Sequence, residues 1–558
     1  MMKRVLSVLI VALSLIGSQH TFAQKSVHSI IPVTPKRELR AVWLTTIGGL
    51  DWPHSYCQSE KSADKQKAEL CSLLDRYKQA GINTVLLQTR IRGTVIYPSA
   101  IEPWDGCITG FPGKAAVYDP LAFAVQECHR RGMELHAWIV CMPIGKRSAL
   151  GSKWLLRHHR KLVYNIGNES YMNPEAEGTP NYIADICDEI VSKYDVDGIH
   201  LDYIRYPENW NRRVNADVAR QNITAIVKCV SQRVKALKPW VKLSCSPIGK
   251  YADLSRYWSH GWNAYSTVYQ EAQKWLQDGW MDELFPMMYF KGDQFYPFAI
   301  NWKEESGGHA VAPGLGIYLL SPKEKDWPLG NITQEMYVLR QYGLGQAFFR
   351  GKFLTDDVKD IYKFVCLFNS NPALVPAATD SNLIVPESPK ELQRKSGRLS
   401  WKGVRPVNGC PNMLYNVYAS AHYPVDVTNS ENLLFTATSD TSIVVPRTNL
   451  HYAVTSMDRF GLESKATQEH NNTPNTMDIV WLDYDSKIQN VRLDSVPQNM
   501  DVKLIVVETL QKQMVGCTLF HHGDKSVRLP NLRPGIYSII AVTSRGASLT
   551  LGRLMLKL

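Results

Sequence analysis

The feature that most constrains the fold is an alternation, repeated eight times between about residues 40 and 367, of a short apolar stretch with a longer amphipathic one. The short stretches are typical of buried strands and lie at 40–46, 83–89, 133–140, 195–207, 241–247, 283–289, 310–318 and 346–350. The longer ones predict helices over 62–80, 119–131, 180–193, 216–237, 266–278, 296–305, 331–342 and 355–367. Eight such β-then-α units are what a (β/α)₈ barrel requires.

An open, doubly wound sheet is the competing arrangement of these units. It is less favoured, because the number of strands equals that of a barrel and no Gly-rich nucleotide turn follows the first strand. We therefore predict an α/β fold, a (β/α)₈ TIM barrel over residues 36–367. Two β-sandwich-like domains are expected to follow it.

The pattern changes after a Pro- and Ser-containing linker at 368–387. Residues 388–470 contain short strands at 399–401, 414–419, 433–436, 442–445 and 452–457, which are separated by turns. Their spacing, with Trp401 early and a Tyr-x-Val strand before the 458–461 turn, resembles a fibronectin type III module. Residues 475–558 are also β-rich. They resemble the C-terminal sorting-type domains of secreted Bacteroidetes proteins, although a plain structural β-domain is the preferred interpretation.

The N-terminus has the features of a secretory signal peptide at 1–23. Lys3 and Arg4 precede an apolar stretch, and Thr21-Phe22-Ala23 resembles a cleavage site. The apolar stretch is too short to span a membrane and no later segment qualifies, so we expect a periplasmic, extracellular or cell-surface protein. The net charge of +11 is scattered along the chain, which argues against nucleic-acid binding. The pairing of the 11 cysteines and the oligomeric state stay open.

Polar side chains accumulate where the predicted barrel strands end. In this fold the strand ends share one face, which carries the active site. The residues expected to contact substrate there are Gln88, Arg90, Tyr97, His136, Trp138, His200, Tyr203, Ser246 and Tyr289. The long loops on that face carry Trp104, Trp154, Trp258 and Trp262. Aromatic rings on such loops are suited to stacking on sugars or, alternatively, to packing the loops onto the barrel.

The barrel resembles the glycosyl hydrolase-like 10 family of secreted bacterial proteins. The resemblance rests on motifs in chain order: 40–46 with 50–53, 88–90, 97–99, 119–121, 131–138, 173–174, 194–207, 246–249 and 286–289. It implies a barrel that acts on bacterial polysaccharide, and members have been linked to peptidoglycan glycan strands that lack stem peptides. Asn173 enters the list of substrate-binding candidates through this resemblance.

Glycoside hydrolysis normally requires two carboxyl groups. Asp202, at the end of the fourth strand, is the first candidate, as nucleophile or base, and Arg205 could hold it ionised or orient it. Glu208 is the preferred second carboxyl. The alternatives are Glu102, Asp105, Glu175 and Asp293, whereas Asp282 precedes its strand and is expected to be structural.

A chitinase-type acid is excluded, because Ile204 occupies its position in the fourth strand and His200 that of an earlier aspartate. His136, His200 and Asp202 could instead form a metal site, but HxH and HExxH spacings are absent from the sequence. We therefore predict a glycoside hydrolase acting on cell-wall polysaccharide, with no cofactor. A non-catalytic carbohydrate-binding protein and a metal-dependent polysaccharide deacetylase are the alternatives.

Overall fold

The structure is a computed structural model. It describes residues 34–469 except 258–260, 396 and 446–449. Beyond 481 it describes 482, 484–485, 490–492, 501–509, 514–521, 524, 526–529, 532, 534–543 and 548–556. The predicted signal peptide at 1–23 lies outside these residues. In the part of the chain that is described, no helix combines the length and apolar character needed to cross a membrane.

The first large unit is a barrel of parallel strands. Its strands are β1 (Arg40–Leu44), β2 (Thr84–Arg90), β3 (Glu134–Val140), β7 (Gly198–Asp202), β8 (Lys242–Cys245), β9 (Glu283–Leu284), β10 (Ala310–Val311), β11 (Gly314–Leu315) and β12 (Gln346–Phe348). The short β10 and β11 are two pieces of one strand, interrupted at Pro313, which has no N–H to donate. Because β10 pairs with β9, β11 with β12 and β12 with β1, the sheet closes on itself. The predicted (β/α)₈ fold is confirmed.

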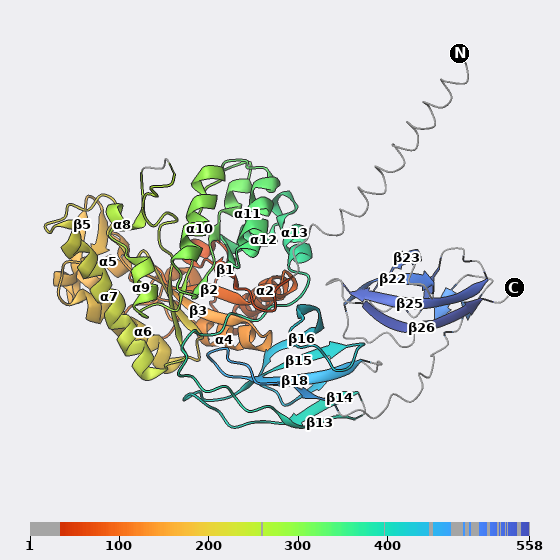
Figure 1. Cartoon of the computed structure of the whole chain (residues 1–558). Coiled ribbons are helices and arrows are strands. Elements are labelled where there is room, and N and C mark those ends of the chain that lie inside the picture. Colours follow the sequence, from red (N-terminus) through yellow and green to blue (C-terminus); the bar gives the residue numbers. More distant parts are fainter. Residues whose placement is uncertain are drawn as a thin grey trace, which may run out of the picture.

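Helices surround the barrel strands (Figure 1), and two of them, at 106–109 and 150–158, lie in stretches that were predicted to be loops. They are α2 (Glu60–Gln79), α3 (Gly106–Thr109), α4 (Pro120–Arg130), α5 (Leu150–His158), α6 (Thr179–Lys193), α7 (Ala216–Leu237), α8 (Ala264–Thr267), α9 (Ala272–Gln277), α10 (Tyr296–Glu304), α11 (Leu329–Gln341), α12 (Gly351–Thr355) and α13 (Ile361–Phe368). Local signals fix their starts. Ser59 forms a capping box with Ser62 before α2, and Asp119 caps α4 ahead of Pro120.

Three local expectations were wrong. The single helix at 266–278 is two short helices, α8 and α9, because Tyr269 between them takes a left-handed φ of 65°. The helix predicted at 355–367 begins only at residue 361, as α13, after a 3₁₀ turn at 358–360, and the separate short α12 precedes it. The loop after β3 contains a small sheet that was not predicted, formed by β4 (Pro143–Lys146), β5 (Val163–Ile166) and β6 (Glu169–Met172).

Side chains alternate between the two faces of the barrel wall. Trp43, Leu86 and Trp138 belong to a cluster inside the barrel, whereas Val42 and Val85 join the larger core beneath the helices. This alternation follows from the period of two in a strand. His200 and Asp202 are two residues apart in β7, so both side chains lie on the inner face of the barrel.

Two β-rich units follow. In the first, β13 (Lys390–Lys395), β14 (Arg398–Lys402) and β17 (Ser442–Val444) form one sheet. The second sheet contains β16 (Leu433–Thr438), β15 (Leu414–Ser420), β18 (His451–Met457) and β19 (Thr467–Gln468), and both sheets share one core. β13 and β19 were not predicted. The fibronectin type III assignment and the domain limits stay predictions.

The last unit has its own core and two antiparallel sheets. One sheet contains β20 (Tyr484–Asp485), β21 (Asn490–Arg492) and β24 (Ser526–Arg528). The other contains β22 (Val502–Thr509), β23 (Met514–Leu519), β25 (Gly535–Thr543) and β26 (Ser548–Leu556). Short 3₁₀ turns in the chain are η2 (Ile47–Gly49), η3 (Arg160–Leu162), η4 (Gly292–Gln294), η5 (Ile317–Leu320), η6 (Val358–Asp360) and η7 (Ser430–Asn432).

A buried arginine joins the first β-unit to the barrel. The Arg459 guanidinium contacts Asp195 at 3.0 Å and Asp197 at 2.9 Å, just before β7, and its side chain is only 4% exposed. Asp197 also contacts His129 Nε2 at 2.8 Å and accepts the Leu135 N–H. The charges of His129 and Arg459, opposed by burial, hold the pKa of Asp197 below its ordinary value. The β-unit therefore supplies a counter-ion to the strand that carries Asp202.

Replacing Arg459 should destabilise the whole barrel and not only the β-unit. Arg459→Met removes one of the two counter-ions of the buried Asp197 and leaves only His129, so the loss should be a large part of the about 3–5 kcal/mol that breaking a buried ion pair typically costs. Arg256→Met is the matched control, because its pair with Glu304 is about half exposed on both sides and such pairs contribute little. Urea unfolding followed by circular dichroism measures both. Equal, small shifts for the two variants would contradict this interpretation.

Candidate functional site

Asp202 lies at the C-terminal end of β7 and is held on both carboxylate oxygens. Oδ1 accepts the Ser246 hydroxyl at 2.7 Å and the Tyr203 N–H at 2.8 Å, and Oδ2 accepts the Trp138 indole N–H at 3.0 Å. Ser246 follows β8 and Trp138 belongs to β3, the two strands that flank β7. The barrel therefore aims donors from both neighbouring strands at one buried carboxyl.

The carboxyl of Asp202 titrates at a higher pH than an ordinary aspartate. Burial raises its pKa above 3.8, while the hydrogen bonds from Ser246, Tyr203 and Trp138 and the charge of Arg205 act in the opposite direction. The folded state therefore keeps the proton to a higher pH than the unfolded chain. The contribution of this group to stability is lost as the pH rises through its folded pKa, so ionised Asp202 destabilises the fold at neutral pH.

Arg205 pairs with Glu208, and its charge acts on Asp202 without a direct hydrogen bond. Its guanidinium is buried and donates to Glu208 Oε1 at 2.7 Å, while Glu208 itself is half exposed. The same guanidinium lies 4.6 Å from the Tyr203 ring centre and 5.7 Å from that of Trp262, and both aromatic residues are partly exposed. The structure thus brings together Asp202, Arg205 and Glu208, the three residues predicted to be catalytic, at the mouth of the barrel.

Tyr289 borders the same carboxyl. Burial, and then the negative charge of Asp202, raise the pKa of the Tyr289 hydroxyl well above 10, so the hydroxyl keeps its proton. Its ring lies 5.7 Å from that of Tyr318, in the turn at 317–320, and 5.3 Å from that of Phe349, which directly follows β12. The sequence analysis did not include Tyr318 and Phe349 among the site residues, although both lie at the ends of predicted strands.

His200 lies inside the barrel and not at its mouth. Trp43 Nε1–H donates to its Nε2 at 3.3 Å, and Nδ1 lies 3.0 Å from the Ser244 hydroxyl. Burial, and then the charge of His136, lower the pKa of His200 well below 6.5, so the ring is neutral at neutral pH. Its contacts are those of a packed interior residue beneath Asp202, and substrate contact stays untested.

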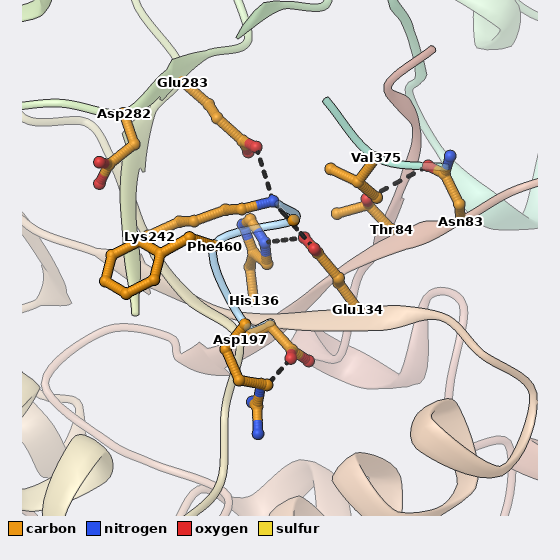
Figure 2. A network of polar contacts seen from close by, with 12 residues as sticks. Asn83, Thr84, Glu134, His136, Asp197, Lys242, Asp282, Glu283, Val375 and Phe460 are labelled. Atoms are coloured by element: carbon orange, nitrogen blue, oxygen red, sulfur yellow. Dashed lines mark hydrogen bonds and ion pairs between the residues drawn. The ribbon is translucent and has the colours of Figure 1, made fainter. Parts of the chain in front are cut away.

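His136 points to the opposite end of the barrel from Asp202. Its Nε2 lies 3.2 Å from Glu134, and Glu134 also forms an ion pair with Lys242 (Figure 2). The His136 ring packs closely against β7 because residue 198 of that strand is glycine. A Cβ at this position would lie 2.6 Å from the ring. We also expected His136 to lie beside Asp202, and this was wrong. Trp138, two positions further along β3, is the residue of that strand that contacts Asp202.

Several other candidates hold the scaffold. Gln88 Oε1 accepts the N–H groups of Thr46 and Ile47, and Tyr97 donates to Glu189. Asn173 accepts the backbone N–H of residue 175. Arg90 forms a fully buried ion pair with Glu102, which also accepts the Tyr182 hydroxyl. These contacts position loops and strand ends, and none of them reaches Asp202.

The remaining candidate carboxyls have different surroundings. Glu102 is taken up by Arg90, and Asp105 caps α3 and accepts Thr94. Glu175 accepts the Trp210 indole, and Asp293 is exposed in η4. Asp282 accepts the Leu243 N–H, in keeping with its structural interpretation. Glu208 is thus the candidate whose partner, Arg205, also acts on Asp202 through its charge.

Two further expectations concern tryptophans and metal ligands. Trp154 donates to the Ile101 carbonyl and packs its loop, Trp262 is exposed beside Arg205, and Trp258 lies outside the described residues. His136, His200 and Asp202 take separate partners. Within the described ranges, His, Cys, Asp and Glu side chains do not gather in any group of three suited to a metal ion.

Residues 38–219 and 209–312 match the profile of the family described as Glycosyl hydrolase-like 10. The chain is 31% identical over 280 residues to Glycosyl hydrolase YngK of Bacillus subtilis (strain 168), covering 46% of this chain and 54% of that protein. It is 29% identical over 287 residues to Glycosyl hydrolase DigH of Escherichia coli (strain K12), covering 45% and 65%. The chain thus spans about half to two thirds of the length of these relatives.

The endo-β-1,4-mannanase from Thermotoga petrophila is similar in structure, with a TM-score of 0.38 and 11% identity over 79% of this chain and 99% of that one. At that TM-score the similarity has no bearing on function. The family match includes Asp202, Arg205, Glu208 and Ser246, and it supports the assignment of the barrel to that family.

The indole N–H of Trp138 should report the titration of Asp202, because it donates directly to the carboxylate. With fluorotryptophan in the protein, the ¹⁹F signal assigned by Trp138→Phe should move with a midpoint above pH 3.8. Ser246→Ala should raise that midpoint further, because the hydroxyl that it removes donates a hydrogen bond that stabilises the ionised carboxylate. Ser246→Thr retains the hydroxyl and should not raise the midpoint. A midpoint at or below 3.8 would contradict the expected direction.

Proposed function

We propose that the chain is a member of the Glycosyl hydrolase-like 10 family and hydrolyses glycosidic bonds of bacterial cell-wall polysaccharide. We further propose that it is exported by its N-terminal segment to the periplasm, the cell surface or the medium. The observation that carries the proposal is the buried carboxyl of Asp202, which accepts three donors at the mouth of the barrel beside Arg205 and Glu208.

In this proposal Asp202 acts as the nucleophile or base. Its three partners are an indole N–H, an amide N–H and a hydroxyl, of which the first two can only donate. That set favours the acceptor-only, ionised form of the carboxyl, and the nearby Arg205 charge favours it too. Water or the sugar anomeric carbon would meet the carboxylate from the open side of the barrel.

Glu208 serves as the second carboxyl and protonates the leaving oxygen. It is accessible from solvent and its position is held by Arg205, whose charge also acts on Asp202. Tyr203, Trp262 and Tyr289 supply ring faces on which sugar C–H groups can stack. Arg205 is then a positioning residue, because it acts through the two carboxyls.

The substrate is tested with a reducing-end assay on peptidoglycan glycan strands freed of stem peptides, with peptide-bearing peptidoglycan and cellulose for comparison. New reducing ends from the peptide-free strands are expected, and Asp202→Asn should reduce the rate at least about 10³-fold, as the loss of a reacting group does. If the unmutated protein binds these strands but releases no product, the chain is a carbohydrate-binding protein and not a hydrolase.

The difference in stability between Asp202→Asn and the unmutated protein should depend on pH. Because the pKa of Asp202 is raised in the folded state, the ionised carboxyl costs stability at pH 7 that the neutral amide does not, whereas the amide NH₂ cannot accept the Trp138 or Tyr203 N–H at any pH. The thermal midpoint of the variant relative to that of the unmutated protein should therefore be higher at pH 7 than below pH 3.8, while activity is lost. A relative midpoint that falls between pH 3.8 and pH 7 would contradict the raised pKa.

The roles of the two carboxyls can be separated with leaving groups of different acidity. Glu208→Gln should lose activity on the natural glycan but retain most of it on an aryl glycoside whose phenolate leaves without protonation. Asp202→Asn should lose both activities. Asp293→Asn, an exposed loop carboxyl, is the matched control and should lose neither. Equal loss on both substrates by Glu208→Gln would remove Glu208 from the role of acid.

A further inference from the structure

The four-stranded sheet of the last unit has one face on a core and one face directed away from it. Its strands lie in the order β23, β22, β25 and β26 (Figure 1). Ile505 of β22 and Ile539 of β25 are fully buried in the core of that unit. Because successive side chains of a strand point to opposite faces, Val506 and Ile540 lie on the other face, where the register pairs them with each other. We call this the outer face.

The outer face is largely apolar, although an antiparallel sheet with one face on a core commonly presents polar side chains on the other. The register places on it Met514, Cys517 and Leu519 of β23, Leu504, Val506 and Glu508 of β22, Ile536, Ser538, Ile540 and Val542 of β25, and Thr550, Arg553 and Met555 of β26. Leu519 is 68% exposed, Met514 62% and Met555 45%. Apolar surface carried across four neighbouring strands is typical of an interaction site.

Two charged side chains, Glu508 and Arg553, lie on the outer face at symmetric positions. The register pairs Glu508 with Ser538 and Ser538 with Arg553, so the two charges share one row and lie on the two strands that flank β25. Because neighbouring strands are about 4.8 Å apart, roughly 10 Å separates their backbones. Within the described part of the chain, neither side chain forms an ion pair.

This arrangement of charge is self-complementary. When two such sheets pack face to face about a two-fold axis that runs along β25, β22 of one copy lies over β26 of the other. Glu508 of each copy then meets Arg553 of the partner subunit, and the apolar rows cover each other. We propose that the outer face is the interface of a homodimer, with the two sheets about 10 Å apart and their strands aligned within about 30°.

Other ways of covering the outer face leave the charges uncompensated. A two-fold axis that runs across the strands, through the row of Val506 and Ile540, would place Glu508 against Leu504 of the partner subunit. A lipid surface would bury both charges in apolar surroundings without a counter-ion, which is costly. The charge pattern therefore favours a second copy in the first orientation. This dimer is independent of whether the barrel is catalytic.

The test measures the self-association of the full chain by sedimentation velocity over a range of protein concentrations. The unmutated protein should form a dimer. Glu508→Arg places like charges opposite each other at both symmetric contacts, as does Arg553→Glu, and each should raise the dimer dissociation constant at least about tenfold. Glu431→Arg is the matched control, because it changes the net charge equally at an exposed residue of the first β-unit, and it should leave the dissociation constant unchanged.

The two weakened variants should associate with each other. An equimolar mixture of Glu508→Arg and Arg553→Glu restores opposite charges at both contacts, as does the double substitution in one chain. Both should return the dissociation constant to within about threefold of the unmutated value, which also shows that the variants are folded. A monomer at every concentration, a dimer that neither single variant weakens, or variants that do not recover on mixing would each overturn the homodimer. A monomer that sediments with phosphatidylglycerol vesicles would overturn it in favour of a lipid surface.

Discussion

A carboxylate inside a barrel requires fixed dipoles where water would otherwise solvate it. Asp202 meets this requirement because β3 and β8 flank β7 and place Trp138 and Ser246 on either side of it. Those positions exist only when β3, β7 and β8 pair in register. The pairing of these strands and the solvation of the carboxylate are therefore one constraint, since a slip of one residue in either neighbouring strand would remove a donor from Asp202.

The same strand carries acidic groups at both ends. Asp197 precedes β7 and is neutralised by Arg459 and His129, whereas Asp202 ends it and is solvated by hydrogen-bond donors. The two solutions differ in their effect on the pKa. Full counter-ions lower the pKa of Asp197, and neutral donors fail to outweigh burial at Asp202. The strand is thus anchored by a stabilising pair at one end and carries a destabilising carboxyl at the other.

The sequence predicted the barrel well because strand and helix periods, caps and glycines are local signals. β-branched runs located the strands, and Asp119-Pro120 located the start of α4. The division of the 266–278 helix depends on Tyr269, whose left-handed backbone goes with packing against Tyr206 at 5.3 Å, a contact distant in sequence. Such breaks cannot be found from periodicity alone.

The site was predicted less completely, for a geometric reason. Placing polar residues on one strand face does not tell how far along the barrel axis each one lies. His136 and Trp138 share a face of β3, yet one contacts Glu134 and the other Asp202. The sequence also could not show that Arg90 is consumed by Glu102, because that pairing depends on how the loop after β2 returns to the barrel.

The Arg459 contact separates two meanings of the word domain. By connectivity, the barrel ends before the 368–387 linker. In terms of stability it extends further, because Arg459, which pairs with Asp195 and Asp197 of the barrel, lies in a turn more than 70 residues after the linker. A barrel truncated at the linker would lack Arg459, and Asp195 and Asp197 would lose this counter-ion. The shortest segment that keeps these ion pairs of the barrel is therefore longer than the segment that the strand topology defines.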